Sequence, residues 1–365
     1  MQSIHLFETT VTTTAKEYVN NVLDSTWLNE GKYVRLFEDR LKRLGFLNPV
    51  TVNSCTSALH LCLRVLGIGP GDEVILPAQT FLATGMVVLQ AGAIPIFADI
   101  DPQTGNISPQ SIQNKITNKT KAIIVVHWGG LSCQMEEINK IAKEIPIIED
   151  AAHAFGGDYQ NAFIGTNRFS DFSCFSFQAI KNMTSGDGGL ICVKDSNYFE
   201  KLRKMKWFGF DRDSMQRRFE GDRVPTVDDV GYKYNMNDIA GALAFGNLDG
   251  YMDRLKKRRE IASLYRKEIR SNGVQFLRID QNCGHAYWVF TMLVEKRKEF
   301  IQMMKDSGIP VSVLDRRIDE HPIFNLTPNL LGQELFDEMQ ISIPVHHKLE
   351  FDQIDHIIST INKGW

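Results

Sequence analysis

The sequence predicts an α/β protein whose larger part is a mainly parallel sheet covered by helices. Between about residue 50 and residue 200, short apolar runs rich in valine and isoleucine alternate with segments whose apolar residues recur at helical spacing. The runs are too short for helices, and strands buried on both faces of a sheet are continuously apolar in this way. Strands that alternate with helices along a chain are typical of a parallel sheet.

The elements follow one another regularly. Six runs are expected to be strands: residues 72–78, 94–100, 121–128, 145–150, 172–177 and 188–195. Three segments between them have apolar residues at helical spacing: residues 57–67, 81–92 and 135–145.

The pattern changes in the second half of the chain. Residues 236–270 are expected to form one long helical segment that leaves the large domain and enters a smaller one. A strand at 287–295 and helices at 298–308 and 351–364 suit a small α+β domain. We therefore predict two domains, one over residues 1–245 and one over residues 246–365.

Composition excludes several classes of protein. The 365 residues are 43% hydrophobic and 23% charged, as in ordinary globular proteins, and the net charge of -3 argues against nucleic acid as a partner. The amino terminus lacks the features of a signal peptide, and the most apolar stretch, Gly85 to Ala98, is too short to span a membrane. The six cysteines are scattered without zinc-site spacing, so we expect reduced thiols, no metal and a cytoplasmic protein.

Reactive side chains follow several predicted strands. Asp150 ends one strand with His153 just beyond it, and Ser176 and Lys181 follow another. In open parallel sheets, functional groups collect at the carboxyl ends of the strands. The residues at these positions are therefore the first candidates for a site.

A third candidate lies where a loop turns into a helix, in the sequence NSCTSALH. The first turn of a helix offers unpaired backbone N–H groups that can bind phosphate, and the hydroxyls of Thr56 and Ser57 would add donors. Serine and threonine are also the usual helix caps, so on its own the motif favours capping.

Lys181 and Asp150 are more informative as a pair. A lysine amine attacks carbonyls when its surroundings depress its pKa, and enzymes that use pyridoxal 5'-phosphate (PLP) hold the cofactor through such a lysine. A carboxylate beside the pyridine nitrogen keeps that nitrogen protonated. Without further pattern, a surface lysine and a loop aspartate would be the simpler interpretation.

A family resemblance shifts that balance. The run EDAAHA, then FSFQAIK followed by GDGG, together with NSCTSALH upstream and GYKYNMNDIAGAL downstream, resembles the nucleotide-sugar aminotransferases of the DegT/StrS type. The likeness extends from WLNEGKYVRLFE to ISIPVHHKL, with the motifs in the family's order. It implies the PLP fold-type I architecture of aspartate aminotransferase, with a mixed sheet of about seven strands, a homodimer with shared active sites, and glutamate as the amino donor.

The resemblance assigns roles residue by residue. Lys181 matches the lysine that binds PLP as a Schiff base, and Asp150 matches the partner of the pyridine nitrogen. His153 matches the polar residue next to the ring oxygen, and Phe81 the aromatic that stacks on the ring. The residues that match phosphate contacts are Thr56, Ser57 and Ser176.

Three places depart from the family pattern. Lys233 stands in GYKYNM where relatives often carry an asparagine that reaches the partner subunit's phosphate, and a lysine could serve there as a point charge. The segment Trp207 to Asp211 replaces a histidine and glycine of many relatives, which leaves its role open. Arg316, Arg317 and His321 could contact a sugar diphosphate or form a solvated turn.

The resemblance also bears on the reaction. It implies amination of a nucleotide-linked keto sugar for a surface polysaccharide or a related glycoconjugate, with release of 2-oxoglutarate. The FSFQAIK form favours C4 of a 4-keto-6-deoxy sugar over C3. The alternatives are a sugar dehydratase, in which relatives replace the lysine by histidine, and a non-catalytic PLP-binding regulator.

Overall fold

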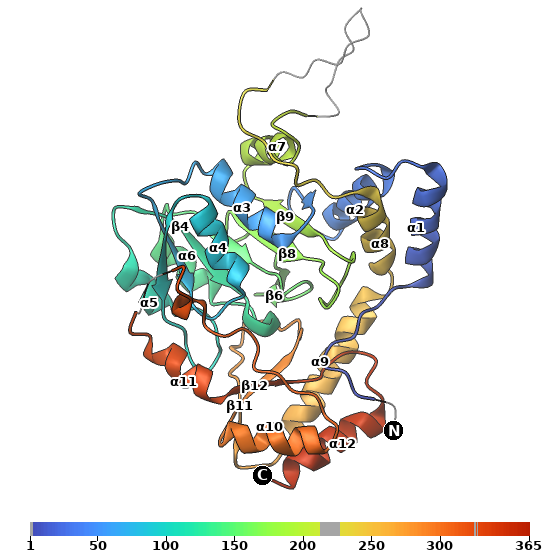
Figure 1. Cartoon of the computed structure of the whole chain (residues 1–365), viewed down its shortest axis with the longest axis vertical. Helices are drawn as coiled ribbons and strands as arrows, with labels where there is room; N and C mark the ends of the chain where they lie inside the picture. Colours follow the sequence, from blue (N-terminus) through green and yellow to red (C-terminus); the bar gives the residue numbers. More distant parts are fainter. Residues whose placement is uncertain (1–2, 212–226, 325, 327) are drawn as a thin grey trace, which may run out of the picture.

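A seven-stranded sheet forms the centre of the computed structural model, which describes residues 3–211, 227–324, 326 and 328–365 (Figure 1). The strands lie in the order β1-β9-β8-β5-β4-β2-β3. Those from β3 to β8 run parallel, whereas β9 is antiparallel to β8 and β1 to β9, so the predicted mainly parallel sheet is confirmed. Their bounds are β1 Val50–Val52, β2 Glu73–Pro77, β3 Ile94–Ala98, β4 Thr120–Val126, β5 Ile147–Asp150, β8 Phe172–Ser176 and β9 Gly189–Val193.

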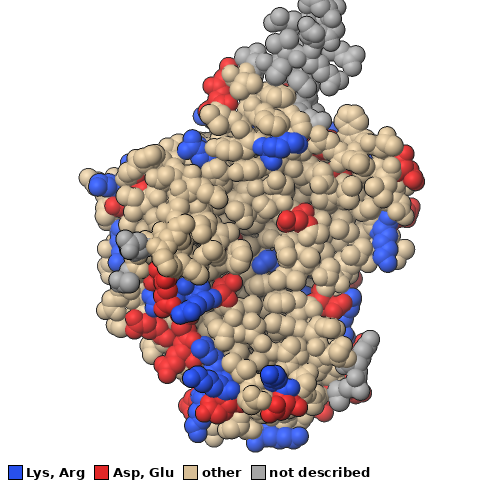
Figure 2. Space-filling model, viewed as in Figure 1, with Lys and Arg blue, Asp and Glu red and all other residues tan. Residues whose placement is uncertain are grey.

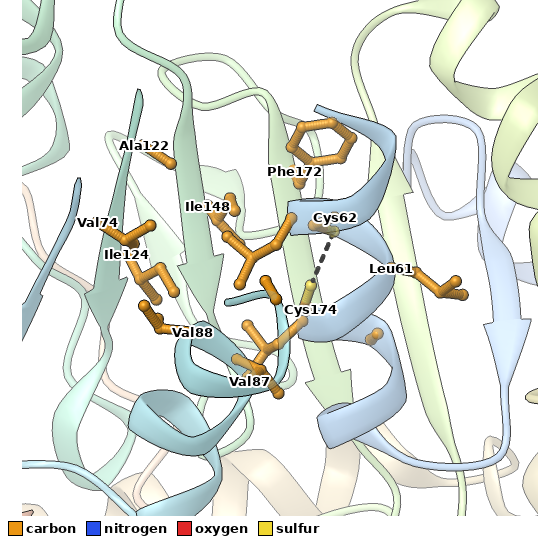
Figure 3. Close-up of a cluster of buried hydrophobic side chains, with 14 of the residues drawn as sticks. Leu61, Cys62, Val74, Val87, Val88, Ala122, Ile124, Ile148, Phe172 and Cys174 are labelled. Atoms are coloured by element: carbon orange, nitrogen blue, oxygen red, sulfur yellow. Dashed lines mark hydrogen bonds between the residues drawn. The ribbon is translucent and has the colours of Figure 1, made fainter. Parts of the chain in front are cut away.

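Alternate residues of these strands face two separate cores. Val74 of β2 packs in one cluster with α3 and α4, while Ile75 packs in another with α5 and α6. Figure 3 shows part of the first cluster, where the Cys62 and Cys174 sulfurs are 3.6 Å apart. The alternation follows from the two-residue period of a strand, and it explains why the strands are apolar throughout. The covering helices are α3 Cys55–Val65, α4 Leu82–Gln90, α5 Pro109–Lys115, α6 Met135–Ala142 and α7 Ser196–Met205.

A group of helices lies beside the β1 side of the sheet. α1 and α2 both pack against α8, and Figure 1 shows the three together. The aromatic rings of Phe37 and Phe177 meet edge to face in the core that joins this group to the sheet. Their bounds are α1 Thr13–Ser25, α2 Lys32–Arg43 and α8 Asp238–Asn247, and two short strands, β6 Asp158–Tyr159 and β7 Ala162–Phe163, form a separate ribbon.

A second, antiparallel sheet lies in the lower part of Figure 1, with strands in the order β10-β11-β12. Its own hydrophobic cluster is drawn almost entirely from residues between Ile261 and Ile361. This agrees with an α+β terminal unit, although the boundary at residues 245 and 246 stays a prediction. The elements are α9 Tyr251–Glu268, β10 Val274–Phe276, β11 Phe290–Val294, α10 Arg297–Asp306, α11 Leu331–Met339, β12 Gln340–Ile343 and α12 Phe351–Asn362, with 3-10 turns at Trp128–Gly130 and Ile318–Glu320.

The prediction of a single helix over residues 236–270 is wrong, because the segment forms two helices. α8 ends at Asn247, and Gly250 has a φ of 65°, in the left-handed region that a helix interior does not contain. The guanidinium of Arg254, in the first turn of α9, donates to the carbonyls of Asn247 and Asp249. These bonds satisfy carbonyl groups that the end of α8 leaves unpaired.

Among the described residues, no helix combines the length and the apolar composition that crossing a bilayer requires.

Candidate active site

A cavity of about 470 Å³ opens at the carboxyl ends of the central strands. It brings together six of the residues that the sequence singled out, from segments more than 120 positions apart. Those six are Thr56, Phe81, Asp150, His153, Ser176 and Lys181. The cavity walls also include Thr84, Trp288 and Asp315, which the sequence had not indicated.

Lys181 follows β8 and points at an aromatic wall. Its Nζ lies 3.7 Å from the centre of the Trp288 ring, and the indole Nε1 of Trp288 donates to the Ile180 carbonyl at 2.9 Å. Burial lowers the pKa of Lys181 to about 8, against the opposing pull of the Asp315 and Asp150 carboxylates. The amine is therefore available as a nucleophile much closer to neutral pH than that of an exposed lysine.

Asp150 is held rigidly at the end of β5. Its Oδ2 accepts a hydrogen bond from the Thr84 hydroxyl at 2.7 Å, and its Oδ1 accepts one from the Ala152 N–H at 3.1 Å. Burial raises the pKa of Asp150, and both hydrogen bonds oppose that rise. A carboxylate fixed in this way is suited to pair with a protonated ring nitrogen of a bound cofactor.

His153 is buried between aromatic residues. Its ring stacks on Trp288 with centroids 3.9 Å apart, and burial together with the Lys181 charge holds its pKa well below the usual value. The ring is therefore neutral. Its Nδ1 is buried without a hydrogen-bond partner among the described residues, an arrangement that fits a polar atom of a bound cofactor.

The start of α3 contributes to the wall of the cavity. Ser54 caps the helix by accepting from the Ser57 N–H at 3.1 Å, and Thr56 lines the cavity. The Ser57 hydroxyl donates to Asn53 Oδ1 at 2.6 Å, and Ser57 does not line the cavity. Phosphate contacts by Thr56 and Ser57 stay predictions, as does that by Ser176, although the helix terminus itself is a suitable anion site.

Phe81 stands at the mouth of the cavity, just before α4 begins, with 61% of its surface exposed. An exposed aromatic ring is available to stack on a flat ligand. Its stacking role stays a prediction.

Lys233 lies outside the cavity lining of its own chain. Its Nζ is 3.6 Å from the centre of the Trp207 ring and donates to Asn235 Oδ1 at 2.8 Å. The Trp207 segment, whose role the sequence left open, thus packs against Lys233 and pairs with it through an isolated bridge.

The basic residues of the turn after Asp315 have partners within that turn. The Arg317 Nη2 lies 2.6 Å from Asp319, and the mostly exposed Arg316 lies 3.0 Å from Glu320. Neither these arginines nor His321 lines the cavity. Both arginines of this turn are therefore engaged in ion pairs within it.

Three cavity residues had no signal in the sequence. Trp288 lies in a run that was expected to be a strand, Thr84 is one helical turn after Phe81, and Asp315 precedes a basic turn. Only the fold brings Trp288 and Asp315 to the strand ends of the large sheet. Aromatic and acidic residues in the second half of the chain could have been candidates, but nothing in the sequence separated them from others of their kind.

The mixed seven-stranded sheet, with a buried lysine after β8 and a fixed carboxylate at the end of β5, defines a PLP-dependent transferase. Within that class, the chain belongs to the DegT/DnrJ/EryC1/StrS aminotransferase family, whose model matches residues 10–362.

Similar proteins agree with this assignment. GDP-perosamine synthase of Escherichia coli O157:H7 is 34% identical, over 100% of this chain and 99% of its own. The sugar aminotransferase CalS13 of Micromonospora echinospora superposes with a TM-score of 0.93 at 30% identity, over 99% of this chain and 100% of its own. Spr1654 of Streptococcus pneumoniae, in its PLP form, superposes with a TM-score of 0.91 at 27% identity, over 99% of this chain and 98% of its own.

The family settles the class of reaction and the cofactor. The chain is a PLP-dependent sugar aminotransferase, which confirms the predicted fold, cofactor and enzyme class. The cavity fits the cofactor, since one chain supplies a nucleophilic lysine, a fixed carboxylate, an unpaired histidine nitrogen and a helix terminus.

Proposed function

We propose that this enzyme transfers the amino group of glutamate to C4 of a 4-keto-6-deoxy sugar carried by a nucleotide, in the cytoplasm. The product would serve a surface polysaccharide or a related glycoconjugate. The observation that carries the proposal is the placement of Lys181 and Asp150 in one cavity. A lysine at this position argues against the dehydratase alternative, in which relatives carry a histidine.

Bound PLP would supply an electron sink for the negative charge that develops on the carbon being deprotonated. Asp150 would keep the proton on the ring nitrogen, and the hydrogen bond from Thr84 holds the carboxylate in place. Once its amine is released, Lys181 would move a proton between the α-carbon of the donor and C4′ of the cofactor. The same amine would serve in both halves of a ping-pong reaction.

Cofactor positioning is divided among the remaining residues. The neutral His153 would contact the ring oxygen, and Phe81 would cover the ring face. Thr56, Ser57 and Ser176 would bind the phosphate at the start of α3.

We further propose a homodimer with shared active sites. Phe81 and Ile180 are large apolar side chains that line the cavity and are exposed on the single chain. Exposed apolar side chains often become covered at an interface with another protein. On the face seen in Figure 2, charged side chains are few across the middle and gather over the lower part. Lys233, outside its own chain's cavity, would reach the phosphate bound by the partner subunit.

Subunit mixing tests the shared site. Lys233→Ala and Lys181→Ala proteins are each expected to be impaired. If Lys233 acts in the partner's site, a mixed dimer has one site with both lysines, and activity should recover toward half that of a wild-type dimer. If Lys233 acts in its own subunit, each site of the mixed dimer lacks one lysine. No recovery, with subunit exchange confirmed, would then rule out the shared site.

A substrate screen tests the function itself. Protein loaded with PLP and treated with glutamate should pass into the pyridoxamine form, and the correct keto sugar nucleotide should reverse that absorbance change. A panel that varies the ketone position separates C4 from C3, and a panel that varies the nucleotide separates the carriers. A protein that binds PLP but shows neither half-reaction would instead support the non-catalytic alternative.

A further inference from the structure

The segment from Leu314 to Ile318 is fixed to the wall of the cavity. The side-chain amide of Gln79, which is fully buried, donates to the Asp315 carbonyl at 3.0 Å, and the Ile318 N–H donates to the Ala78 carbonyl at 3.0 Å. Gln79 is itself held by the Gln333 amide, which donates to its Oε1 at 2.6 Å. The second half of the chain therefore places Asp315 against the loop that carries Phe81.

Asp315 directs a carboxylate into the cavity. Its Oδ2 is buried and has no hydrogen-bond partner among the described residues. Its φ of 46° lies in the left-handed region, which aspartate, asparagine and glycine adopt most readily. A buried carboxylate oxygen without a donor is costly, so the site favours a ligand that donates a hydrogen bond to it.

The charged groups around Asp315 narrow the choice of ligand. Lys181 and Asp150 are the groups whose charges act on it most directly. A carboxylate repels the two carboxylates of the amino donor and the phosphate groups of the cofactor and of the nucleotide. The hydroxyl groups of the sugar ring are uncharged, and each is able to donate a hydrogen bond to it.

We propose that Asp315 accepts a hydrogen bond from a hydroxyl group of the sugar substrate and so contributes to recognition of the sugar ring. The assignment rests on the proposed function, because it requires a sugar in the second half-reaction. It makes Asp315 a specificity-determining residue, whereas Lys181 and Asp150 serve both half-reactions.

Two variants test the assignment without straining the backbone, because asparagine and glycine both tolerate the left-handed conformation. Single-turnover measurements follow the glutamate half-reaction and the sugar half-reaction separately. For Asp315→Asn we expect about a tenfold loss in the sugar half-reaction, and for Asp315→Gly about a hundredfold loss, as for a hydrogen bond to a charged group. The Kd of the sugar nucleotide, taken from the concentration dependence of the single-turnover rate, should rise by similar factors, while the glutamate half-reaction stays within about twofold of wild type.

Glu320→Gln is the matched control, since Glu320 is an exposed carboxylate of the 3-10 turn that follows this segment and does not line the cavity. It should leave both half-reactions and the Kd unchanged. An unaffected sugar half-reaction in the Asp315 variants would overturn the assignment. Equal losses in both half-reactions would also overturn it, because the carboxylate would then act on Lys181. A wild-type protein that reacts with glutamate but with no keto sugar nucleotide would overturn the proposed function and this assignment with it.

Discussion

The two walls of the cavity differ in how they are built. One wall consists of strand ends of the large sheet and the start of α3. Asp150 and Ser176 are the last residues of their strands, and Lys181 lies in the loop after β8. The other comes from the second half of the chain, where Trp288 and Asp315 lie in irregular segments that dock across the sheet. We propose that the first wall carries the groups needed for any transamination and that the second wall contacts the sugar substrate. The following changes test that division.

The largest effect should come from the strand-end wall. Lys181→Ala removes both the cofactor attachment and the group that moves the proton, so we expect each half-reaction to slow by at least about 1000-fold. Single-turnover absorbance with glutamate measures the loss. Retention of near-normal rates would move the base to another residue.

Asp150→Asn should have the next largest effect. Cofactor should still bind, but an amide cannot hold the ring nitrogen protonated, so both half-reactions should fall about 100-fold or more. Cofactor retained after gel filtration checks binding, and single-turnover rates check chemistry. Loss of only the sugar half-reaction would contradict the division between the walls.

Thr84→Val should weaken the same wall through Asp150. Valine keeps the shape of the side chain but removes the donor to Oδ2, so the pKa of Asp150 should rise further. We expect both half-reactions to slow by about tenfold, with the acid limb of their pH profile moved upward. Thr80→Val is the control, because the Thr80 hydroxyl hydrogen-bonds to the Thr84 hydroxyl at 2.7 Å rather than to Asp150. A loss at all pH values without a shifted limb would indicate disrupted packing instead.

The pH dependence of Lys181 offers a smaller but diagnostic effect. Burial lowers its pKa to about 8, so the free amine appears as pH rises through about 8, well below the range of an exposed lysine. In cofactor-free protein, the rate of modification of Lys181 by PLP should therefore have its midpoint near pH 8. A midpoint near pH 10 would show that the cavity does not desolvate the amine.

The smallest effect should come from the basic turn beyond the second wall. Arg316 is mostly exposed, and its ion pair with Glu320 is of the kind that contributes about 0–1 kcal/mol. Arg316→Ala should change either half-reaction by less than about threefold. A large loss confined to the sugar half-reaction would instead place Arg316 on the diphosphate.

The sequence predicted the strand-end wall because its residues follow a repeated pattern. Asp150 ends one apolar run and Lys181 lies a few residues after another, and their chemistry identifies them. The helix break at Gly250 was missed because glycine is compatible with helical spacing, while the turn depends on Arg254 satisfying carbonyls of the preceding helix.

The second wall could not be predicted from local pattern. The position of Asp315 depends on the hydrogen bond that the Gln79 amide donates to its carbonyl, and the two residues are more than 200 positions apart in the sequence. Ser57 is a residue type that suits a phosphate contact, but its hydroxyl donates to Asn53 in this structure. Hydrogen bonds to other parts of the chain therefore set where the side chains of Asp315 and Ser57 lie, and residue type alone does not reveal them.

We propose that Lys181 is the residue that holds the cofactor covalently. Reduction of the PLP-loaded protein with borohydride, followed by digestion and peptide mass spectrometry, would test it most directly. The account predicts one pyridoxyl label per chain, on Lys181. A label on another lysine, or none on any, would contradict it.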